Sequence, residues 1–221
     1  SGLTSHCPGV TLAQPKGTVV CGDATDRLTH IAAAGWTLVG TEVHVADAEM
    51  RDVPRDMQTV GEVVVRSDNV MDGYYLEPDA TRAAITDGWL RTGDMAVWDE
   101  ENYIHIVDRK KDIIISGGEN ISSIEVEKAI FDHPAVLECA VVSAPDPRWG
   151  EIPVAIIVLK PDQQLNQEQL MHFLEPRIAK FKMPRVVNFV EGPLPKTGTG
   201  KMLKRQLREA FWSGKSTRVQ G

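Results

Sequence analysis

The sequence holds only three cysteines in 221 residues, and they form no CxxC pair. Because Cys7, Cys21 and Cys139 lie far apart, we predict neither a disulfide framework nor a cysteine zinc site, and we favour a reducing compartment. The chain also lacks an apolar run of the roughly 18 residues needed to cross a bilayer, and its first residues lack the features of a secretory signal. We therefore expect a cytoplasmic protein without a transmembrane segment.

Positive charge is scarce as well, because 24 Lys and Arg face 31 Asp and Glu and the formal net charge is −7. This balance argues against a nucleic-acid partner. The positive charge is also uneven, since residues 177–221 hold 11 basic residues and only two acidic ones. A solvated C-terminal helix would account for this basic tail, and so would a surface that meets a nucleotide or coenzyme.

Histidine patterns typical of metal or nucleophilic sites are absent too. The chain has neither an HExxH motif nor a Ser, His, Asp order, and its histidines fall in no ligand spacing. We therefore predict no metal site. The composition is that of an ordinary globular protein, with 42% hydrophobic and 25% charged residues, and is sufficient to bury a core.

Up to residue 109 the sequence pattern is mainly that of β-strands. Apolar and polar side chains alternate in several short runs, and a polar turn joins the last two runs as a hairpin. A proline in the first turn indicates one short helix. The predicted elements are strands at 17–21, 36–45, 60–66, 95–98 and 103–107 and a helix at 78–85.

After Asp108 the pattern changes, because three basic residues precede an apolar strand and a glycine loop. Ser122 with Glu125, and Asn166 with Gln169, have the spacing of helix capping boxes. Strands and helices then alternate, which predicts a compact α/β domain. The predicted elements are strands at 113–115, 136–143, 152–159 and 185–190 and helices at 122–133, 166–180 and 202–211.

A glycine-rich loop, PKTGTGK at 195–201, ends in a lysine just before a predicted helix. It is not a Walker phosphate loop, because Pro195 and Met202 stand where that motif needs Gly and Ser or Thr. A flexible turn can still bring the ammonium group of Lys201 to an anion. A helix-entry turn with a solvated lysine is the competing interpretation.

Two more glycine segments could carry chemistry. In GWLRTGD, Asp94 follows a glycine turn, and its carboxylate could accept both hydroxyls of a ribose or simply face solvent. In ISGGEN, the adjacent Gly117 and Gly118 allow a ligand to approach the backbone closely, or they serve a tight connection.

In order and spacing, the segments TGD, DRKKDIIISGGENISSIEVE, PDPRWGE and PKTGTGK resemble the AMP-forming acyl-CoA synthetases and their adenylating relatives. The resemblance covers residues 60–212, and the wording GGENISSIEVE is most similar to fatty-acyl members. It implies an α/β fold with two parts: 1–109, a β-rich part of the large adenylating domain, and 110–221, a small mobile α/β lid. The hinge is expected near 108–112.

The same resemblance implies a two-step reaction and assigns roles to single residues. A fatty or other carboxylic acid reacts with ATP to give acyl-AMP, and the thiol of CoA then displaces AMP. Asp94 and Arg109 would hold the ribose, Lys111 would be the hinge residue, and Lys201 would be the catalytic lysine of the first step. The remaining implied contacts are Gly117, Gly118, Glu119 and Arg148 for CoA and Thr4 for the nucleotide.

The resemblance also implies ATP, Mg²⁺ and CoA as substrates of a longer enzyme, with none of them bound tightly by these 221 residues. A large N-terminal domain with a Ser/Thr/Gly-rich phosphate loop would come first, and Ser5 stands where the family holds magnesium with Glu. We therefore expect the 221 residues alone to be inactive. A carrier protein as acyl acceptor and a non-catalytic binding module stay open as alternatives, as does a homo-oligomer.

Overall fold

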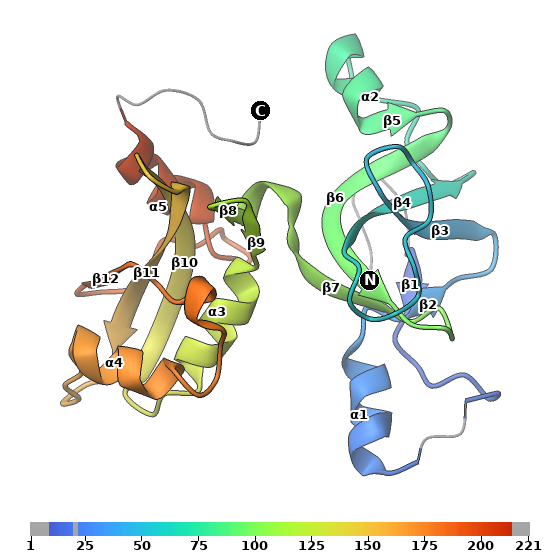
Figure 1. Cartoon of the computed structure of the whole chain (residues 1–221). Coiled ribbons are helices and arrows are strands. Elements are labelled where there is room, and N and C mark those ends of the chain that lie inside the picture. Colours follow the sequence, from blue (N-terminus) through green and yellow to red (C-terminus); the bar gives the residue numbers. More distant parts are fainter. Residues whose placement is uncertain (1–8, 20–21, 214–221) are drawn as a thin grey trace. The chain divides into compact units, whose positions relative to one another are not determined.

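The computed structural model describes residues 9–19 and 22–213. Contacts between Cα atoms divide the chain after Lys110 into two compact units, which we call unit 1, ending at Lys110, and unit 2, starting at Lys111. Strands dominate unit 1, whereas unit 2 combines strands with helices (Figure 1). None of the described helices is long and apolar enough to span a membrane. The fold is thus mixed α/β and rich in strands.

Unit 1 is built around a five-stranded antiparallel sheet. Its long, curved strand β6 (Trp89–Trp98) pairs with β4 (Gly61–Ser67), β5 (Ile85–Thr86) and β7 (Ile104–Arg109), and β3 (Thr41–Ala46) pairs with the other edge of β4 (Figure 1). Valine side chains from β3 and β4 pack with the apolar end of β6 in one buried core. The predicted hairpin therefore exists, as the β6–β7 pair.

The start of unit 1 differs from the prediction. The described part of the expected strand 17–21 is a turn, and helix α1 (Ala24–Ala32) follows where no helix was predicted. Two short strands, β1 (Thr11–Leu12) and β2 (Trp36–Thr37), pair with each other. The nine residues of α1 give too short an apolar pattern to stand out from the surrounding loops, and most of its side chains are exposed.

Two other predictions in unit 1 have clear outcomes. The predicted strand 36–45 is split into β2 and β3, because the chain turns at Gly40, whose φ of +81° lies in the left-handed region. The predicted short helix is confirmed as α2 (Pro78–Ala84), with proline in its first turn.

The sheet of unit 2 is centred on two long strands. β10 (Val136–Asp146) and β11 (Gly150–Leu159) form an antiparallel hairpin, and β12 (Val186–Phe189) runs parallel to β11. A small hairpin of β8 (Ile114–Ser116) and β9 (Glu119–Ile121) joins the sheet where Ser116 of β8 pairs with Gly150 of β11. The basic segment of the sequence leads into this hairpin through the 3₁₀ turn η1, residues 110–112.

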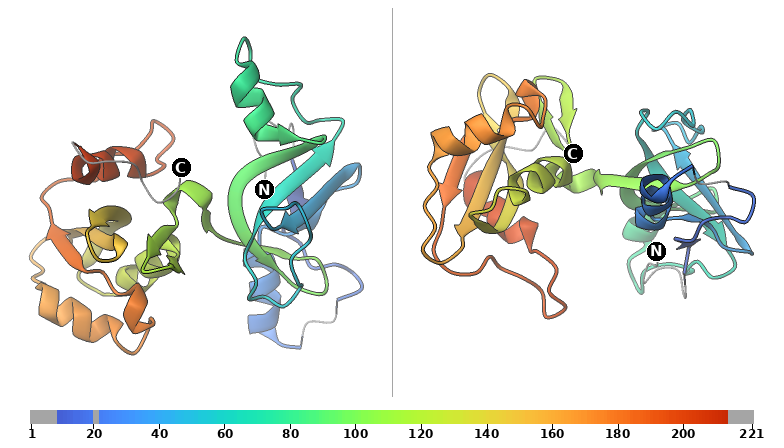
Figure 2. Two further views of the ribbon diagram at one scale, coloured as in Figure 1. Left: turned by 45° about the horizontal axis from the view of Figure 1, so that its top comes forward. Right: turned by 90° about the horizontal axis from the view of Figure 1, so that it is seen from below.

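Helices cover both faces of the β10–β11 hairpin. Successive strand residues point to opposite faces, and both sets are apolar, as expected for strands buried on both sides. Helices α3 (Ser123–Phe131) and α4 (Gln167–Leu174) contribute to one core, and α5 (Lys204–Trp212) contributes to the other. Figure 2 shows α4 and α5 on opposite sides of the strands. The α/β character predicted for this part of the chain is confirmed.

Both predicted helix caps in unit 2 are confirmed, but the predicted end of α4 is wrong, and α5 starts at Lys204 rather than at 202. Ser122 caps α3 by accepting from the Glu125 amide at 3.1 Å, and Asn166 and Gln169 form a reciprocal capping box on α4. α4 ends at Leu174 rather than at 180, because Pro176 has no amide hydrogen to donate the next helical hydrogen bond. The 3₁₀ turn η2 (Lys180–Lys182) then leads to β12.

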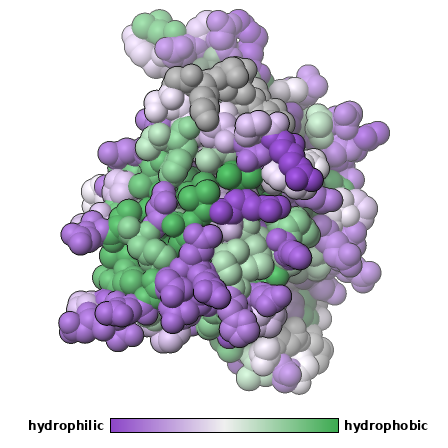
Figure 3. Space-filling view, turned by 60° about the vertical axis from the view of Figure 1, so that its left-hand side comes forward, coloured by the Kyte–Doolittle hydropathy of each residue, from purple (hydrophilic) through white to green (hydrophobic). Residues whose placement is uncertain are grey.

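β12 lies at an edge of the sheet, since β11 is its only partner among the described strands. Val186, Phe189 and Val190 are each more than a third exposed. Figure 3 shows apolar side chains gathered among polar ones on the side of the molecule that carries this strand. Nothing in the described structure shows what would cover this area.

Candidate functional site

The first group of predicted site residues comes together through the register of β6 and β7. Asp94 stands opposite Arg109 in this pairing, and Arg109 Nε lies 3.0 Å from Asp94 Oδ1. The Asp94 side chain is 17% exposed, whereas that of Arg109 is 50% exposed. Asp94 therefore lies within a strand, not in the turn that the sequence predicted, and its carboxylate is oriented by a cation that solvent can reach.

Thr92 and Gly93 hold the backbone of this segment in place. The Thr92 hydroxyl donates to the carbonyl of Val63 at 2.7 Å and accepts from the Asp94 amide at 3.1 Å. Gly93 has a φ of +73°, which lies in the left-handed region where glycine is favoured. The TGD sequence is therefore a local kink in β6 that aims Asp94 at Arg109.

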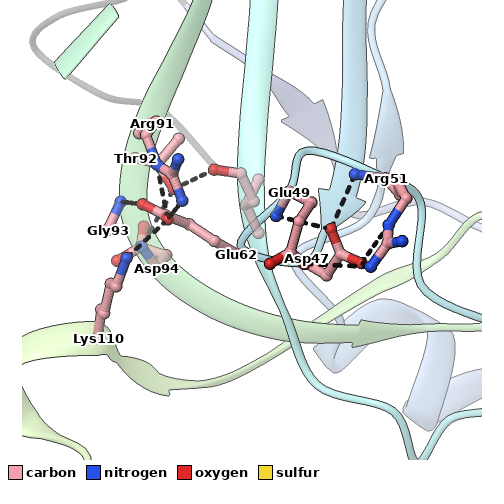
Figure 4. A network of polar contacts seen from close by, with 10 residues as sticks. Asp47, Glu49, Arg51, Glu62, Arg91, Thr92, Gly93, Asp94 and Lys110 are labelled. Atoms are coloured by element: carbon pink, nitrogen blue, oxygen red, sulfur yellow. Dashed lines mark hydrogen bonds and ion pairs between the residues drawn. The ribbon is translucent and has the colours of Figure 1, made fainter. Parts of the chain in front are cut away.

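Next to this kink lies Glu62, which the sequence analysis did not single out. Its carboxylate is 6% exposed and accepts from Arg91 Nη2 at 2.8 Å, from Lys110 Nζ at 3.2 Å and from the Gly93 amide at 3.1 Å (Figure 4). Burial by itself raises the pKa of the Glu62 carboxyl, but the hydrogen bond from Arg91 and the charges of Lys110 and Arg91 outweigh burial and lower that pKa below 4.5. Glu62 thus stays ionised and ties β4, β6 and the end of unit 1 together.

The predicted hinge residue, Lys111, is the first residue of unit 2 and lies in η1. Its carbonyl accepts from Arg208 Nη1 at 3.0 Å, and the same guanidinium nitrogen lies 2.9 Å from Asp112 Oδ1. Arg208 and Asp112 are 13% and 14% exposed. The segment after Lys110 is therefore anchored to α5.

The paired glycines form the tight turn between β8 and β9. Gly117 and Gly118 have φ values of +62° and +89°, so both occupy the left-handed region. A Cβ at Gly117 would lie 2.6 Å from Cε3 of Trp149, and the Gly117 amide donates to the Trp149 carbonyl at 2.8 Å. A Cβ at Gly118 would meet no heavy atom within 4 Å, and Glu119 is exposed. Gly118 therefore borders open space, whereas Gly117 packs against Trp149.

Two arginine guanidinium groups lie near the ring of Trp149. The guanidinium carbon of Arg148 is 4.8 Å from the ring centroid of Trp149, and that of Arg185 is 5.3 Å away. Asp146 holds this turn, because its Oδ1 accepts from the amides of Arg148 and Trp149, and these hydrogen bonds, with the two guanidinium charges, lower its pKa. The result is an exposed pair of cations on an aromatic ring, beside the glycine turn. Sequence reasoning singled out Arg148 but not Arg185.

Lys201 lies at the end of a closed turn. The Thr197 amide donates to the Lys201 carbonyl at 2.8 Å, and the Lys201 amide donates to the Thr197 hydroxyl at 3.1 Å. Gly200, with a φ of +82°, allows the chain to reverse here. The Lys201 side chain is exposed, and its ammonium group pairs with no side chain in the described part of the chain.

Apart from the hinge residue Lys111, the predicted residues described by the structure thus fall into three local groups. Asp94 lies beside Arg109 in unit 1; the glycine turn lies beside the Arg148–Trp149 turn in unit 2; Lys201 is alone on its loop. Thr4 lies outside the described residues. Within residues 9–19 and 22–213, no group of three His, Cys, Asp or Glu is arranged to hold a metal ion.

The chain is similar in sequence to known protein families and to individual proteins. The AMP-binding enzyme family matches residues 2–75, and the AMP-binding enzyme C-terminal domain matches residues 125–201. A long-chain-fatty-acid–CoA ligase from Thermus thermophilus is 42% identical over 95% of the chain and 39% of its own length. A feruloyl-CoA synthase from an Amycolatopsis species is 40% identical over 95% of the chain and 40% of its own length.

Comparison of the fold with solved structures also finds members of this family. ATP-bound MatB from Rhodopseudomonas palustris matches with a TM-score of 0.77 and 35% identity, over 82% of this chain and 36% of that one. The chain spans about two fifths of the length of the curated relatives it matches. The family matches, the identities and the shared fold together show that the chain belongs to the AMP-binding, adenylate-forming superfamily of the acyl-CoA synthetases.

Proposed function

We propose that this chain forms part of an ATP-dependent acid–CoA ligase of the AMP-forming type. In the first step a substrate carboxylate oxygen attacks the α-phosphorus of ATP, and pyrophosphate leaves with the electron pair of the broken bond. In the second step the thiol of CoA attacks the acyl carbon, loses its proton, and AMP leaves. The observation that carries this proposal is the Asp94–Arg109 pair, a carboxylate held by a half-exposed guanidinium at the end of unit 1.

In this proposal Asp94 accepts hydrogen bonds from the ribose hydroxyls of the nucleotide. A carboxylate can take two neighbouring hydroxyls at once, and Arg109, whose Nε lies 3.0 Å from Asp94 Oδ1, orients it. Arg109 also adds positive charge near the phosphates. Glu62 supports the pair indirectly, because it holds the Gly93 amide and Lys110 on either side. The magnesium ion would arrive with the polyphosphate of ATP.

Lys201 would supply the charge that the first step needs. A carboxylate and an α-phosphate repel each other, and a cation about 4 Å from an anion offsets about 4 kcal/mol at an effective dielectric constant of roughly 20. The exposed side chain on its glycine turn can deliver this charge and withdraw afterwards. Lys111 would be the hinge that moves unit 2 between the two steps.

The arginine pair on Trp149 supports the second step. We propose that Arg148 meets a phosphate of CoA and that Gly118, next to open space, with Glu119, borders the path of the pantetheine arm. Arg185 adds a second positive charge near Trp149, beside that of Arg148. We further propose that the substrate is a fatty or related carboxylic acid and that the protein acts in the cytoplasm.

The test uses the complete gene product. ATP–pyrophosphate exchange with a panel of fatty and aromatic acids reports the first step, and thioester formation from supplied acyl-AMP reports the second. Lys201→Ala should reduce exchange by about a hundredfold or more while the second step stays within a few-fold. Lys128→Ala, an exposed lysine on α3, is the control and should change neither.

Three results would contradict the proposal. Equal loss of both steps in Lys201→Ala would refute the role of that lysine. Transfer to a carrier protein but not to CoA would replace CoA as acceptor. Absence of exchange with every acid, in a folded complete protein that binds CoA, would favour a binding module.

A further inference from the structure

Helix α5 reaches back to the segment that starts unit 2. Arg208 on this helix donates to the Lys111 carbonyl at 3.0 Å and lies 2.9 Å from Asp112 Oδ1, and the two charged side chains are 13% and 14% exposed. The residues are 96 positions apart in sequence. One guanidinium thus holds both a backbone and a side-chain acceptor of η1, with little access for water.

This pair differs from an ordinary surface ion pair on the same helix. Arg205 pairs with Glu209 at 2.7 Å, but those side chains are 82% and 60% exposed and belong to one helix. Exposed pairs of that kind contribute little, because water and salt screen them. A buried guanidinium with two acceptors in a distant segment instead fixes the position of that segment.

α5 is fixed at its first turn as well. Lys204 Nζ lies 2.7 Å from Glu127 Oε1 and donates to the Ser123 hydroxyl at 2.7 Å, both on α3. Lys204 and Arg208 are four residues apart, so they share one face of α5. Lys201 lies only three residues before α5 begins. The helix that follows the Lys201 loop is therefore held to α3 through Lys204 and to η1 through Arg208.

On the other side of the link, the chain is held by unit 1. Lys110 Nζ lies 3.2 Å from the buried carboxylate of Glu62. Lys110 is thus tied to unit 1, whereas the next residue and Asp112 are tied to unit 2. Any rotation of one unit against the other is then restricted to the few backbone torsions between these anchors.

We propose that Arg208 is a positioning residue, which makes residues 111 and 112 part of the same rigid body as the Lys201 loop. A rotation at the 110–111 link then moves Lys201 as a whole with α5 instead of being absorbed by a flexible connection. The contacts to Lys111 and Asp112 do not depend on the reaction, but the catalytic consequence rests on the proposed function.

The structural part is tested by hydrogen exchange on the 221-residue chain. Arg208→Ala should speed exchange of the amides of residues 111–113 about tenfold, because a buried charged hydrogen bond is lost, and should leave the β10–β11 amides unchanged. Arg208→Lys should recover part of the protection. Asp112→Asn, which keeps size but removes the charge, gives a second and milder version of the test. Arg205→Ala is the matched control on the same helix.

The catalytic part is tested by kinetics of the complete gene product. Arg208→Ala should lower kcat for adenylation about tenfold and leave KM for ATP within twofold, because the proposed ribose contacts, Asp94 and Arg109, belong to unit 1. Arg208→Lys should restore most of kcat. Arg205→Ala should leave both constants unchanged.

The outcomes separate cleanly. Equal exchange of residues 111–113 in Arg208→Ala and Arg205→Ala would show that Arg208 does not hold this segment. Faster exchange with unchanged kcat would refute the positioning role in catalysis. If the wild-type protein forms neither acyl-AMP nor acyl-CoA, the proposed function fails, and the exchange experiment still decides whether Arg208 anchors the segment.

Discussion

Gly117→Ala should destabilise unit 2 more than Gly118→Ala, although both changes add the same methyl group to the same turn. Both glycines have positive φ, +62° and +89°, so either alanine costs about 1 kcal/mol of backbone strain. Only the Cβ at 117 meets a neighbour, Cε3 of Trp149 at 2.6 Å. Displacing the packed indole adds about 1–3 kcal/mol. We therefore expect losses of about 2–4 kcal/mol for Gly117→Ala and about 1 kcal/mol for Gly118→Ala.

The assay must report on unit 2 alone, because a chain of two units need not unfold in one step. Hydrogen exchange of the slowest amides in β10 and β11 gives the free energy of unfolding of this unit. A double-mutant cycle then isolates the indole contact. In a Trp149→Ala background, Gly117→Ala should cost only the strain of about 1 kcal/mol. The same cost for Gly117→Ala with and without Trp149 would refute the reasoning.

Two further predictions concern buried ionisable groups. Because the folded-state pKa of Glu62 is lowered, its carboxylate stabilises the fold above about pH 4.5 and loses this contribution as pH falls through the lowered value. Urea unfolding should therefore show Glu62→Gln less stable than wild type at pH 7, and this difference in the free energy of unfolding should shrink below pH 4.5. The exposed Glu100→Gln is the control. A difference that does not change with pH would contradict the argument. Burial raises the pKa of the Cys139 thiol to about 12. Iodoacetamide at pH 8.5 should therefore leave Cys139 unmodified in the folded chain and alkylate it in urea, as measured by mass spectrometry. Rapid labelling of the folded chain would contradict this prediction.

Local signals predicted the elements of unit 2 well. The caps at Ser122 and Asn166 are short-range hydrogen bonds between residues three apart, so their spacing is visible in the sequence. The predicted end of α4 is wrong although Pro176 marks it in the sequence, and Ile178 continues the apolar spacing of Leu170 and Leu174 beyond the proline. The missed helix α1 spans only nine residues, so its apolar side chains, Leu28, Ile31 and Ala32, form too short a pattern to reveal it.

The arrangement of Asp94 was harder to predict, because it depends on pairing between strands. TGD reads as a turn, since glycine is a common turn residue. In the structure it is a kink inside β6, and the register with β7 brings Arg109 opposite Asp94. A shift of one residue in this register would move Arg109 to the other face of the sheet. The motif singled out Asp94 and Arg109, and the strand pairing explains why they meet.

Residues that sequence reasoning missed all act through distant partners. Glu62 and Lys110 are 48 positions apart, and Arg208 and Asp112 are 96 apart. A glutamate in the otherwise apolar run VGEVVVR was a usable signal for Glu62, because a charge at a buried strand position needs a partner. Arg185 and Arg208 gave no such signal, since a basic residue in a basic segment looks solvated.

A count of charges in the basic tail, residues 177–221, does not show how many of them form ion pairs within the fold. Both interpretations of this segment, a solvated helix and a polyanion surface, assumed that its charges face outward. Several of them instead pair inside unit 2 with acidic residues that lie before the tail. These pairs are Lys182 with Glu125, Lys196 with Glu138, Lys204 with Glu127 and Arg208 with Asp112. The positive charge left for a phosphate ligand is therefore smaller than the count of 11 suggests, and the exposed Lys201 and Arg185 belong to it.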